Sequence, residues 1–150
     1  MDNLKLPAFE YRLRNHGQSK QIFDSIRKKF VALTPEEWVR QHLINFLVKE
    51  KKYPASLLAV EMPLLLNNLK KRADIVAYNN KGEAIVLVEC KAPTVKITQS
   101  SFDQAARYCL ATDIILIIVS NGITNYCAEI DRVNQTYIFR KEIPDFTEIL

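Results

Sequence analysis

The feature that most constrains the fold is the segment from Arg72 to Pro93, where two apolar, β-branched runs flank a short polar stretch. The first run ends at Tyr78 and the second begins at Ala84. The residues between them include Asn and Gly, which favour the tight turn of an antiparallel β-hairpin. The segment therefore predicts two paired strands, and the rest of the chain has to supply the elements that cover them.

Three charged residues interrupt the apolar strands at the open end of this hairpin. Asp74 lies in the first strand, whereas Glu89 and Lys91 close the second strand two residues apart and therefore share one face. A symmetric turn places Asp74 opposite Leu87 and diagonally beside Glu89. Diagonal neighbours have Cα atoms roughly 7 to 8 Å apart, so the two carboxylates are expected to converge on one cation.

The cost of burying these charges favours a bound metal ion. Charged groups in an apolar strand pair are expensive to desolvate unless something binds between them. Asp74, Glu89 and the backbone carbonyl of Cys90 offer hard oxygen ligands of the kind that Mg²⁺ or Mn²⁺ prefers. Lys91 would then orient or activate a water molecule and stabilise charge on a phosphate. The alternative is a salt-bridge network among the same charged residues at the strand end.

The spacing of these residues resembles the signature of the PD-(D/E)xK nuclease superfamily. Asp74 is followed, after a gap of fourteen residues, by Glu89-Cys90-Lys91. Gln104 and Tyr108, four residues apart, look like the Gln-x-x-x-Tyr helix motif of the RecB-like and type I restriction branches. The Pro of the superfamily name is absent, because an alanine precedes Asp74.

The chain is also similar to a family of small bacterial proteins named after the N-terminal nuclease domain of the type I restriction enzyme R subunit. Two segments, Ile22–Lys29 and Leu33–Gln41, carry this similarity, which extends from about Leu4 to about Phe139. It implies a restriction-endonuclease-like α/β core and Mg²⁺-dependent cleavage of DNA. It also implies that the Gln-x-x-x-Tyr pair orients the lysine and contacts DNA.

The residues from Thr34 onward predict the start of a helix, with Pro35 at the first helical position and Glu37 two residues further on. This pattern predicts a capping box, in which the side chains of Thr34 and Glu37 each accept a hydrogen bond from the backbone N–H of the other residue. It also predicts a helix that ends near Lys49. Glu37 has a second interpretation, because some members of the superfamily place a helix glutamate near the metal. Capping alone explains the residue, so both interpretations stay open.

The remaining pattern predicts a single α/β domain with a central mixed β-sheet flanked by helices and a small N-terminal β-hairpin extension. Pro63 cannot donate to a ladder and therefore suggests an edge position or a bulge. The apolar run from Asp113 to Ser120 predicts a central strand buried on both faces. The expected elements are an edge strand (9–14), a second hairpin (20–24 and 29–33, where a helical stripe also fits), a helix (35–50), a strand (56–66), the central hairpin, a helix capped by Ser100 or Ser101 that ends near Ala111, the buried strand, two further strands (123–130 and 135–140) and a short helix after Pro144.

Charge is compatible with nucleic acid as a partner without demonstrating it. The 150 residues carry a net charge of +4 and a sequence pI near 9.0. Basic residues gather at Arg27–Lys29 and in the turn Asn67–Arg72 just before Asp74. Each group either contacts phosphates or is a solvated turn.

The cysteines and apolar runs predict a cytoplasmic protein without a membrane segment. Three widely spaced cysteines predict free thiols in a reducing compartment, and no Cys-x-x-Cys pair suggests zinc. The longest apolar run, Ile114–Val119, is too short to span a bilayer. No Gly-x-x-x-x-Gly-Lys-[Ser/Thr] motif occurs, so a motor or specificity unit would be a separate chain.

Three functions are compatible with this pattern. The first is a metal-dependent DNA endonuclease that uses Asp74, Glu89 and Lys91, assisted by Gln104 and Tyr108. The second is a DNA-binding subunit that keeps the fold but cleaves nothing without a partner chain. The third is a homodimeric nuclease that acts on junctions or flaps.

Overall fold

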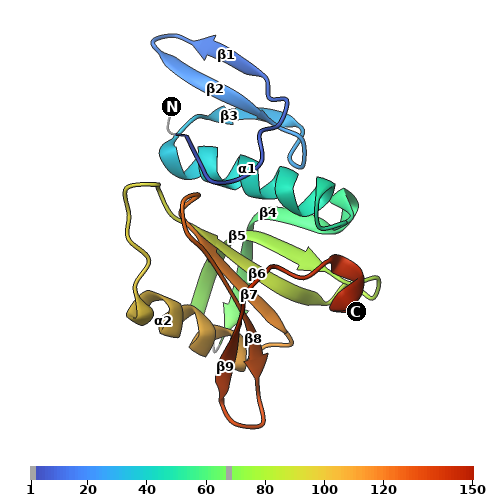
Figure 1. Ribbon diagram of the computed structural model, residues 1–150. Helices are drawn as coiled ribbons and strands as arrows, with labels where there is room; N and C mark the ends of the chain where they lie inside the picture. Colours follow the sequence, from blue (N-terminus) through green and yellow to red (C-terminus); the bar gives the residue numbers. More distant parts are fainter. Residues whose placement is uncertain (1–2, 67–68) are drawn as a thin grey trace.

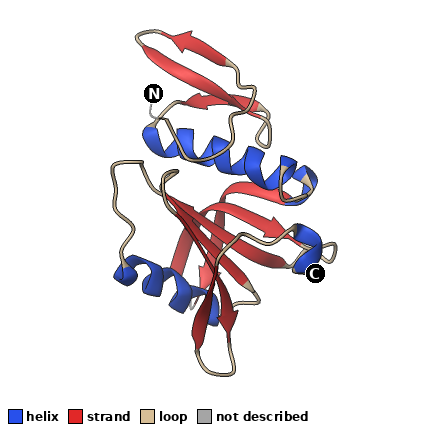
Figure 2. Cartoon of the chain, viewed as in Figure 1, coloured by secondary structure: helices blue, strands red, loops and turns tan. Residues whose placement is uncertain are grey.

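A computed structural model describes residues 3–66 and 69–150 of the chain. Helix α1 lies between a small three-stranded sheet and a six-stranded sheet, and α2 covers the opposite face of the larger sheet (Figures 1 and 2). The elements are β1 (Leu13–His16), β2 (Ser19–Asp24), β3 (Lys29–Ala32), α1 (Pro35–Lys49), the 3₁₀ turn η1 (Ala55–Leu57), β4 (Leu58–Leu66), β5 (Leu69–Tyr78), β6 (Ala84–Cys90), α2 (Gln99–Leu110), β7 (Leu116–Ser120), β8 (Asn125–Asp131), β9 (Thr136–Arg140) and the 3₁₀ turn η2 (Phe146–Glu148).

The larger sheet has the order β4-β5-β6-β7-β8-β9. Its neighbours are antiparallel except β6 and β7, which are parallel and are joined through α2. A parallel pair needs a crossover connection of this kind. The predicted α/β fold with a mixed sheet flanked by helices is confirmed, and β7, with all five residues buried, is the predicted central strand.

Two apolar layers hold the sheet between its helices. On one face, Leu43 and Leu47 of α1 belong to a core cluster that includes Val86 and Val88 of β6. On the other face, Leu87 belongs to a second cluster that includes side chains of α2. This alternation along β6 explains why the strand is apolar from Ala84 to Val88, since both of its faces are covered.

The N-terminal strands form one three-stranded sheet, which corrects the predicted boundaries. The first strand begins at Leu13 instead of Phe9, because the rings of Phe9 and Tyr11 pack against Trp38 of α1. The hairpin of β2 and β3 is confirmed, and the helical alternative for this segment is wrong.

The register of the central hairpin differs from the symmetric prediction. Ile75 pairs with Val88 and Val76 pairs with Leu87, so Leu87 does not lie opposite Asp74. A bulge at Ala77 and Tyr78, next to the turn, moves the pairing. The pairing of the two strands ends at Ile75 and Val88, and Asp74 contacts β6 through its side chain, which accepts from the Cys90 N–H.

The edge position suggested by Pro63 is confirmed, since β4 is the first strand of the larger sheet and pairs, among the described strands, with β5 alone. The predicted cap of the second helix is wrong. Thr98, not a serine, is the N-cap of α2: its hydroxyl accepts from the Ser101 N–H, and Ser101 accepts from the Thr98 N–H. Within the described residues, no helix is long and apolar enough to cross a membrane.

Candidate active site

Three of the predicted site residues line one small cavity at the end of β6. Glu89 and Lys91 come from the strand and its continuation, and Gln104 comes from α2. The cavity has a volume of about 70 Å³, which is room for a few water molecules. Its lining residues are Glu89, Lys91, Ser101, Gln104, Ala105 and Val119.

Tyr108 lies one helical turn beyond Gln104 and is almost fully buried. Burial raises the pKa of its hydroxyl, and the nearby groups of Cys109 and Glu89 raise it further. The hydroxyl therefore stays protonated at neutral pH and keeps a proton to donate. Tyr108 belongs to the same apolar cluster as Ala105 and Val119, which line the cavity, so it packs on the same side of the sheet.

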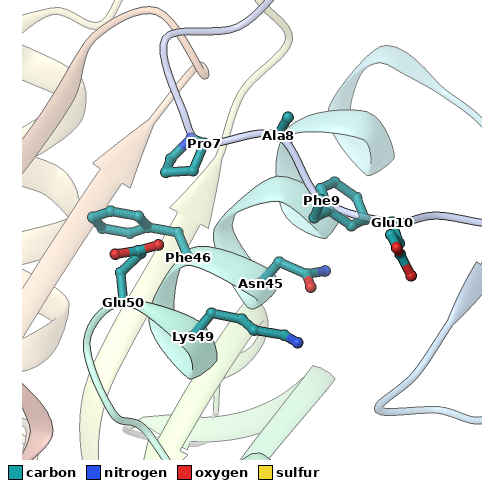
Figure 3. A pocket seen from close by; sticks show the side chains of 8 residues that line it. All are labelled: Pro7, Ala8, Phe9, Glu10, Asn45, Phe46, Lys49 and Glu50. Atoms are coloured by element: carbon teal, nitrogen blue, oxygen red, sulfur yellow. The ribbon is translucent and has the colours of Figure 1, made fainter.

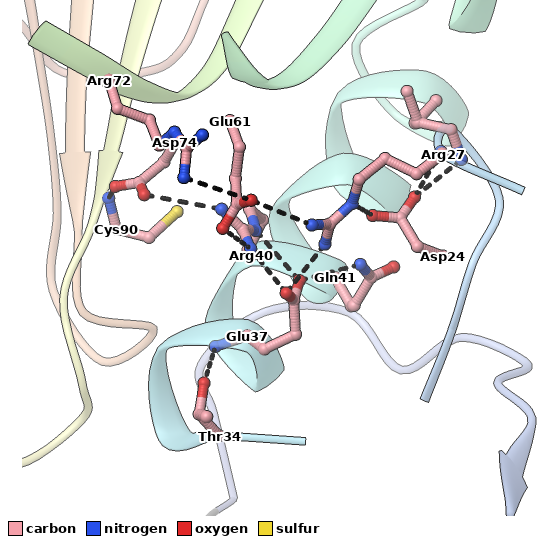
Figure 4. Close-up of polar contacts among 11 residues, drawn as sticks. Asp24, Arg27, Thr34, Glu37, Arg40, Gln41, Glu61, Arg72, Asp74 and Cys90 are labelled. Atoms are coloured by element: carbon pink, nitrogen blue, oxygen red, sulfur yellow. Dashed lines mark hydrogen bonds and ion pairs between the residues drawn. The ribbon is translucent and has the colours of Figure 1, made fainter. Parts of the chain in front are cut away.

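Asp74 approaches the same strand end from β5. The backbone N–H of Cys90 donates to its Oδ2 at 2.7 Å, and Arg40 Nη1 lies 3.5 Å from its Oδ1 (Figure 4). The carboxylate thus ends the β5–β6 ladder and faces α1. Its side chain keeps about 29% of its surface exposed, so one edge is still reachable from solvent.

Asp74 and Glu89 both act on the thiol of Cys90, which directly follows Glu89 in the chain. Burial raises the pKa of this thiol, Asp74 and Glu89 raise it further, and Arg40 opposes them. Two carboxylates at one strand end suit Mg²⁺ or Mn²⁺, which commonly use one or two carboxylates and fill the remaining positions with water. The described residues hold no group of three or more His, Cys, Asp or Glu side chains placed to bind a metal, so such an ion would depend on these two.

Glu37 does not form the predicted capping box. Thr34 does cap α1, since its hydroxyl accepts from the Glu37 N–H at 3.0 Å. The Thr34 N–H, however, donates to the Ala32 carbonyl instead of to the glutamate. The Glu37 carboxylate turns to the buried side of the helix and accepts from Arg27, Arg40 and Gln41.

These contacts belong to a network of alternating acids and arginines that runs from the N-terminal sheet to the site (Figure 4). Arg27 Nε lies 2.6 Å from Asp24 Oδ2, and Arg27 Nη2 lies 2.8 Å from Glu37 Oε1. Arg40 extends this series of contacts, because its Nε lies 2.9 Å from Glu37 Oε2 and its Nη1 lies near Asp74. We call this set the arginine network; its members are Asp24, Arg27, Glu37, Arg40, Glu61 and Asp74.

Glu61 enters the arginine network from an unusual backbone position. Its φ is +54° in the middle of β4, between pairs that place it opposite Asp74. A non-glycine residue rarely adopts this conformation, and such strain gathers at functional sites. The Glu61 carboxylate lies 3.4 Å from Arg27 and 3.3 Å from Arg40, so this strained residue forms an ion pair with each arginine.

Sequence reasoning missed the arginine network. The sequence predicts that Arg27 belongs to a basic patch that contacts phosphate or water, but its side chain turns inward to Asp24 and Glu37. One signal was available, because Glu37 and Arg40 are three residues apart and share a helix face. The other predicted basic group falls on residues 67–72. The first two lie outside the described part of the chain, and the other four belong to strand β5 instead of the predicted turn.

Acid is expected to weaken the fold through Glu37. Burial raises the pKa of this carboxyl, but hydrogen bonds from Arg40 and Gln41, the charge of Arg40 and the bond from Arg27 together lower it below the ordinary 4.5. Its contribution to stability is therefore complete above the unfolded pKa and disappears as pH falls through the lower folded pKa. Thermal unfolding of the wild type and Glu37→Gln should differ most near neutral pH and converge in acid. A gap that stays constant down to about pH 3 would contradict this assignment.

A larger cavity, of about 460 Å³, lies between the N-terminal arm and the last turns of α1 (Figure 3). Phe9 and Glu10 of the arm face Asn45, Phe46 and Lys49 of the helix there (Figure 3). None of the predicted site residues lines it. Size alone therefore does not identify the candidate site, because Glu89, Lys91 and Gln104 line the small cavity instead.

Comparison with known families identifies the chain. The family described as type I restriction enzyme R protein N terminus (HSDR_N) matches residues 35–144, which is more than two thirds of the sequence. The chain belongs to this family. The HSDR_N match starts at the first residue of α1, includes Asp74, Glu89, Lys91, Gln104 and Tyr108, and leaves β1–β3 outside. No curated protein and no solved structure matches this HSDR_N chain significantly.

Proposed function

We propose that this chain is a metal-dependent nuclease that hydrolyses phosphodiester bonds in DNA, most simply as an endodeoxyribonuclease. The observation that carries the proposal is the shared cavity of Glu89, Lys91 and Gln104, beside Asp74 and Tyr108, in a chain of a restriction R-protein family. A lysine among carboxylates in a concave site is what phosphoryl transfer needs, since catalysis there is mainly positioning and charge stabilisation.

Asp74 and Glu89 would hold Mg²⁺ or Mn²⁺, with the Cys90 carbonyl and water as further ligands. Such an ion, when bound, polarises phosphate oxygens and makes water a better nucleophile at neutral pH. Lys91 would place its ammonium group on the phosphate oxygen where negative charge grows. Gln104 would hold the Lys91 side chain in position, and the protonated Tyr108 hydroxyl would donate a hydrogen bond to an acceptor bound in the same cavity.

Glu37 would act as a positioning residue, not as a metal ligand. Its carboxylate already accepts four hydrogen bonds, from Arg27, from two nitrogens of Arg40 and from Gln41. Four is about the number that a carboxylate can accept, so no lone pair is left for an ion. Glu37 therefore fixes the guanidinium of Arg40, and that guanidinium in turn lies against Oδ1 of Asp74.

The test is cleavage of supercoiled, linear, single-stranded and branched DNA by the purified chain with Mg²⁺ or Mn²⁺, beside reactions in EDTA. We expect cutting that requires the metal and that ranks the four substrates. Binding of DNA without cutting of any of them would favour the second candidate, a subunit that needs a separate motor or specificity chain. A doubled molecular mass together with a preference for branched DNA would favour the homodimeric nuclease.

A further inference from the structure

A second, aromatic pocket lies beside the candidate active site. It has a volume of about 150 Å³ and is built by the start of α2 and the β8–β9 hairpin. Phe102 forms its buried base, with its ring centroid 4.9 Å from that of Phe139 and 6.4 Å from that of Tyr126. Tyr126 and Phe139 are 40% and 48% exposed, so their rings are reachable from solvent. Ile97, Thr98 and Gln99 complete its lining.

The strand register fixes how close this pocket is to the active-site cavity. Glu89 pairs with Val119 of β7, and Val119 pairs with Tyr126 of β8. Directly paired residues point to the same face, so the three side chains form one row across the sheet on the side of α2. Neighbouring strands are about 4.8 Å apart, which puts Tyr126 roughly 10 Å from Glu89.

Helix α2 joins the two sites as well. Its residues Ser101 and Gln104 line the cavity, whereas Gln99 and Phe102 line the aromatic pocket. The charge along this face suits a polyanion, since Lys91 lines the cavity and the exposed Lys96 directly precedes Ile97 of the pocket. A strand whose phosphate lies at Lys91 would therefore pass the aromatic rings within one or two nucleotides.

We propose that this aromatic pocket holds an unpaired nucleobase of the DNA strand whose phosphate lies in the Glu89–Lys91 cavity. The proposal rests on the proposed function and adds a substrate class, namely DNA with an unstacked base beside the cut. The pocket is about half the size of the smallest typical drug-sized sites, so it accommodates one ring system and not a base pair. Every base has a π-face that stacks on an aromatic side chain, and a base outside the helix is free to do so.

The test is binding of a short fluorescent DNA strand in EDTA, where no metal-dependent cutting occurs. Tyr126→Ala is expected to weaken binding of the single strand on the order of 10-fold, whereas Tyr126→Phe, which keeps the ring, should bind like the wild type. Ile138→Ala removes an exposed apolar side chain from β9 outside the pocket lining, and Tyr11→Ala removes an exposed aromatic ring on the N-terminal arm. Both controls should leave binding unchanged.

A strand with abasic sites provides the second arm. The wild type should bind it as weakly as Tyr126→Ala binds the normal strand, and the substitution should cost nothing further. Equal binding of normal and abasic strands by the wild type would overturn the pocket assignment, as would an equal loss in Ile138→Ala. A self-association that Tyr126→Ala abolishes would also overturn it, because the rings would then cover a second copy of the chain.

The two proposals fail separately. If Tyr126→Ala leaves DNA binding unchanged while the protein still shows metal-dependent cutting, the base-pocket proposal fails and the nuclease proposal stands. Ring-dependent binding without any cutting would keep the base pocket and remove the nuclease activity of the isolated chain.

Discussion

Replacement of Arg40 by Met is expected to lower the free energy of unfolding by about 3–5 kcal/mol, the usual cost of breaking a buried ion pair from one side. Only 8% of the Arg40 side chain and 5% of the Glu37 side chain are exposed. Without the guanidinium, Glu37 would keep its charge in the interior with Arg27 and Gln41 as partners. Methionine preserves the aliphatic stem, so the loss reports the charge and its hydrogen bonds.

The expected shift in thermal midpoint is roughly 10 °C for a chain of this size. Lys49→Met is the matched control, because Lys49 is an exposed cation in the last turn of the same helix. Its loss removes only a helix-end charge and should cost less than about 1 kcal/mol. A double-mutant cycle with Glu37→Gln should show coupling between the two sites. Equal stability of Arg40→Met and Lys49→Met would show that the arginine network contributes nothing.

Replacement of Lys91 by Met is expected to reduce the rate of DNA cleavage by about 100- to 1000-fold, as removal of one charge-stabilising group in an active site typically does. The side chain lines the same cavity as Glu89 and Gln104, and methionine keeps most of its length. Loss of the ammonium group should lower mainly the catalytic rate and change DNA affinity little, because the group stabilises negative charge that develops on the phosphate in the transition state.

Lys81→Met is the control for charge, since Lys81 is an exposed residue in the hairpin turn at the opposite end of β5 and β6. Single-turnover cleavage and thermal unfolding of both variants should separate catalysis from folding. Equal cleavage by Lys91→Met and the wild type would remove Lys91 from the chemistry.

The fold was predictable where local signals and burial agree. Helix α1 starts at the predicted Thr34-Pro35 signal, and the apolar run that ends at Ser120 forms the predicted central strand. The hairpin was also predictable, but its register was not, because the bulge at Ala77 and Tyr78 depends on the geometry of the turn. A composition-based pattern carries no information on such a shift.

The candidate site was predictable only where its residues are close in sequence or follow a known spacing. Glu89, Lys91 and Gln104, which the resemblance to the nuclease signature groups together, line one cavity. The arginine network was not predictable, because Arg27 and Glu61 come from elements far apart in the chain. Only the packing of the N-terminal sheet on α1 brings them together, and periodicity in one segment does not describe packing between segments.

The central claim is that Asp74 and Glu89 hold a divalent metal ion, and Mn²⁺ binding measured by electron paramagnetic resonance of the free ion tests it most directly. The wild type should bind Mn²⁺ saturably, and Asp74→Asn and Glu89→Gln should each abolish that binding while remaining folded. Glu83→Gln, in the exposed hairpin turn, should bind like the wild type. Equal Mn²⁺ binding by all four proteins, or none by the wild type, would contradict the account.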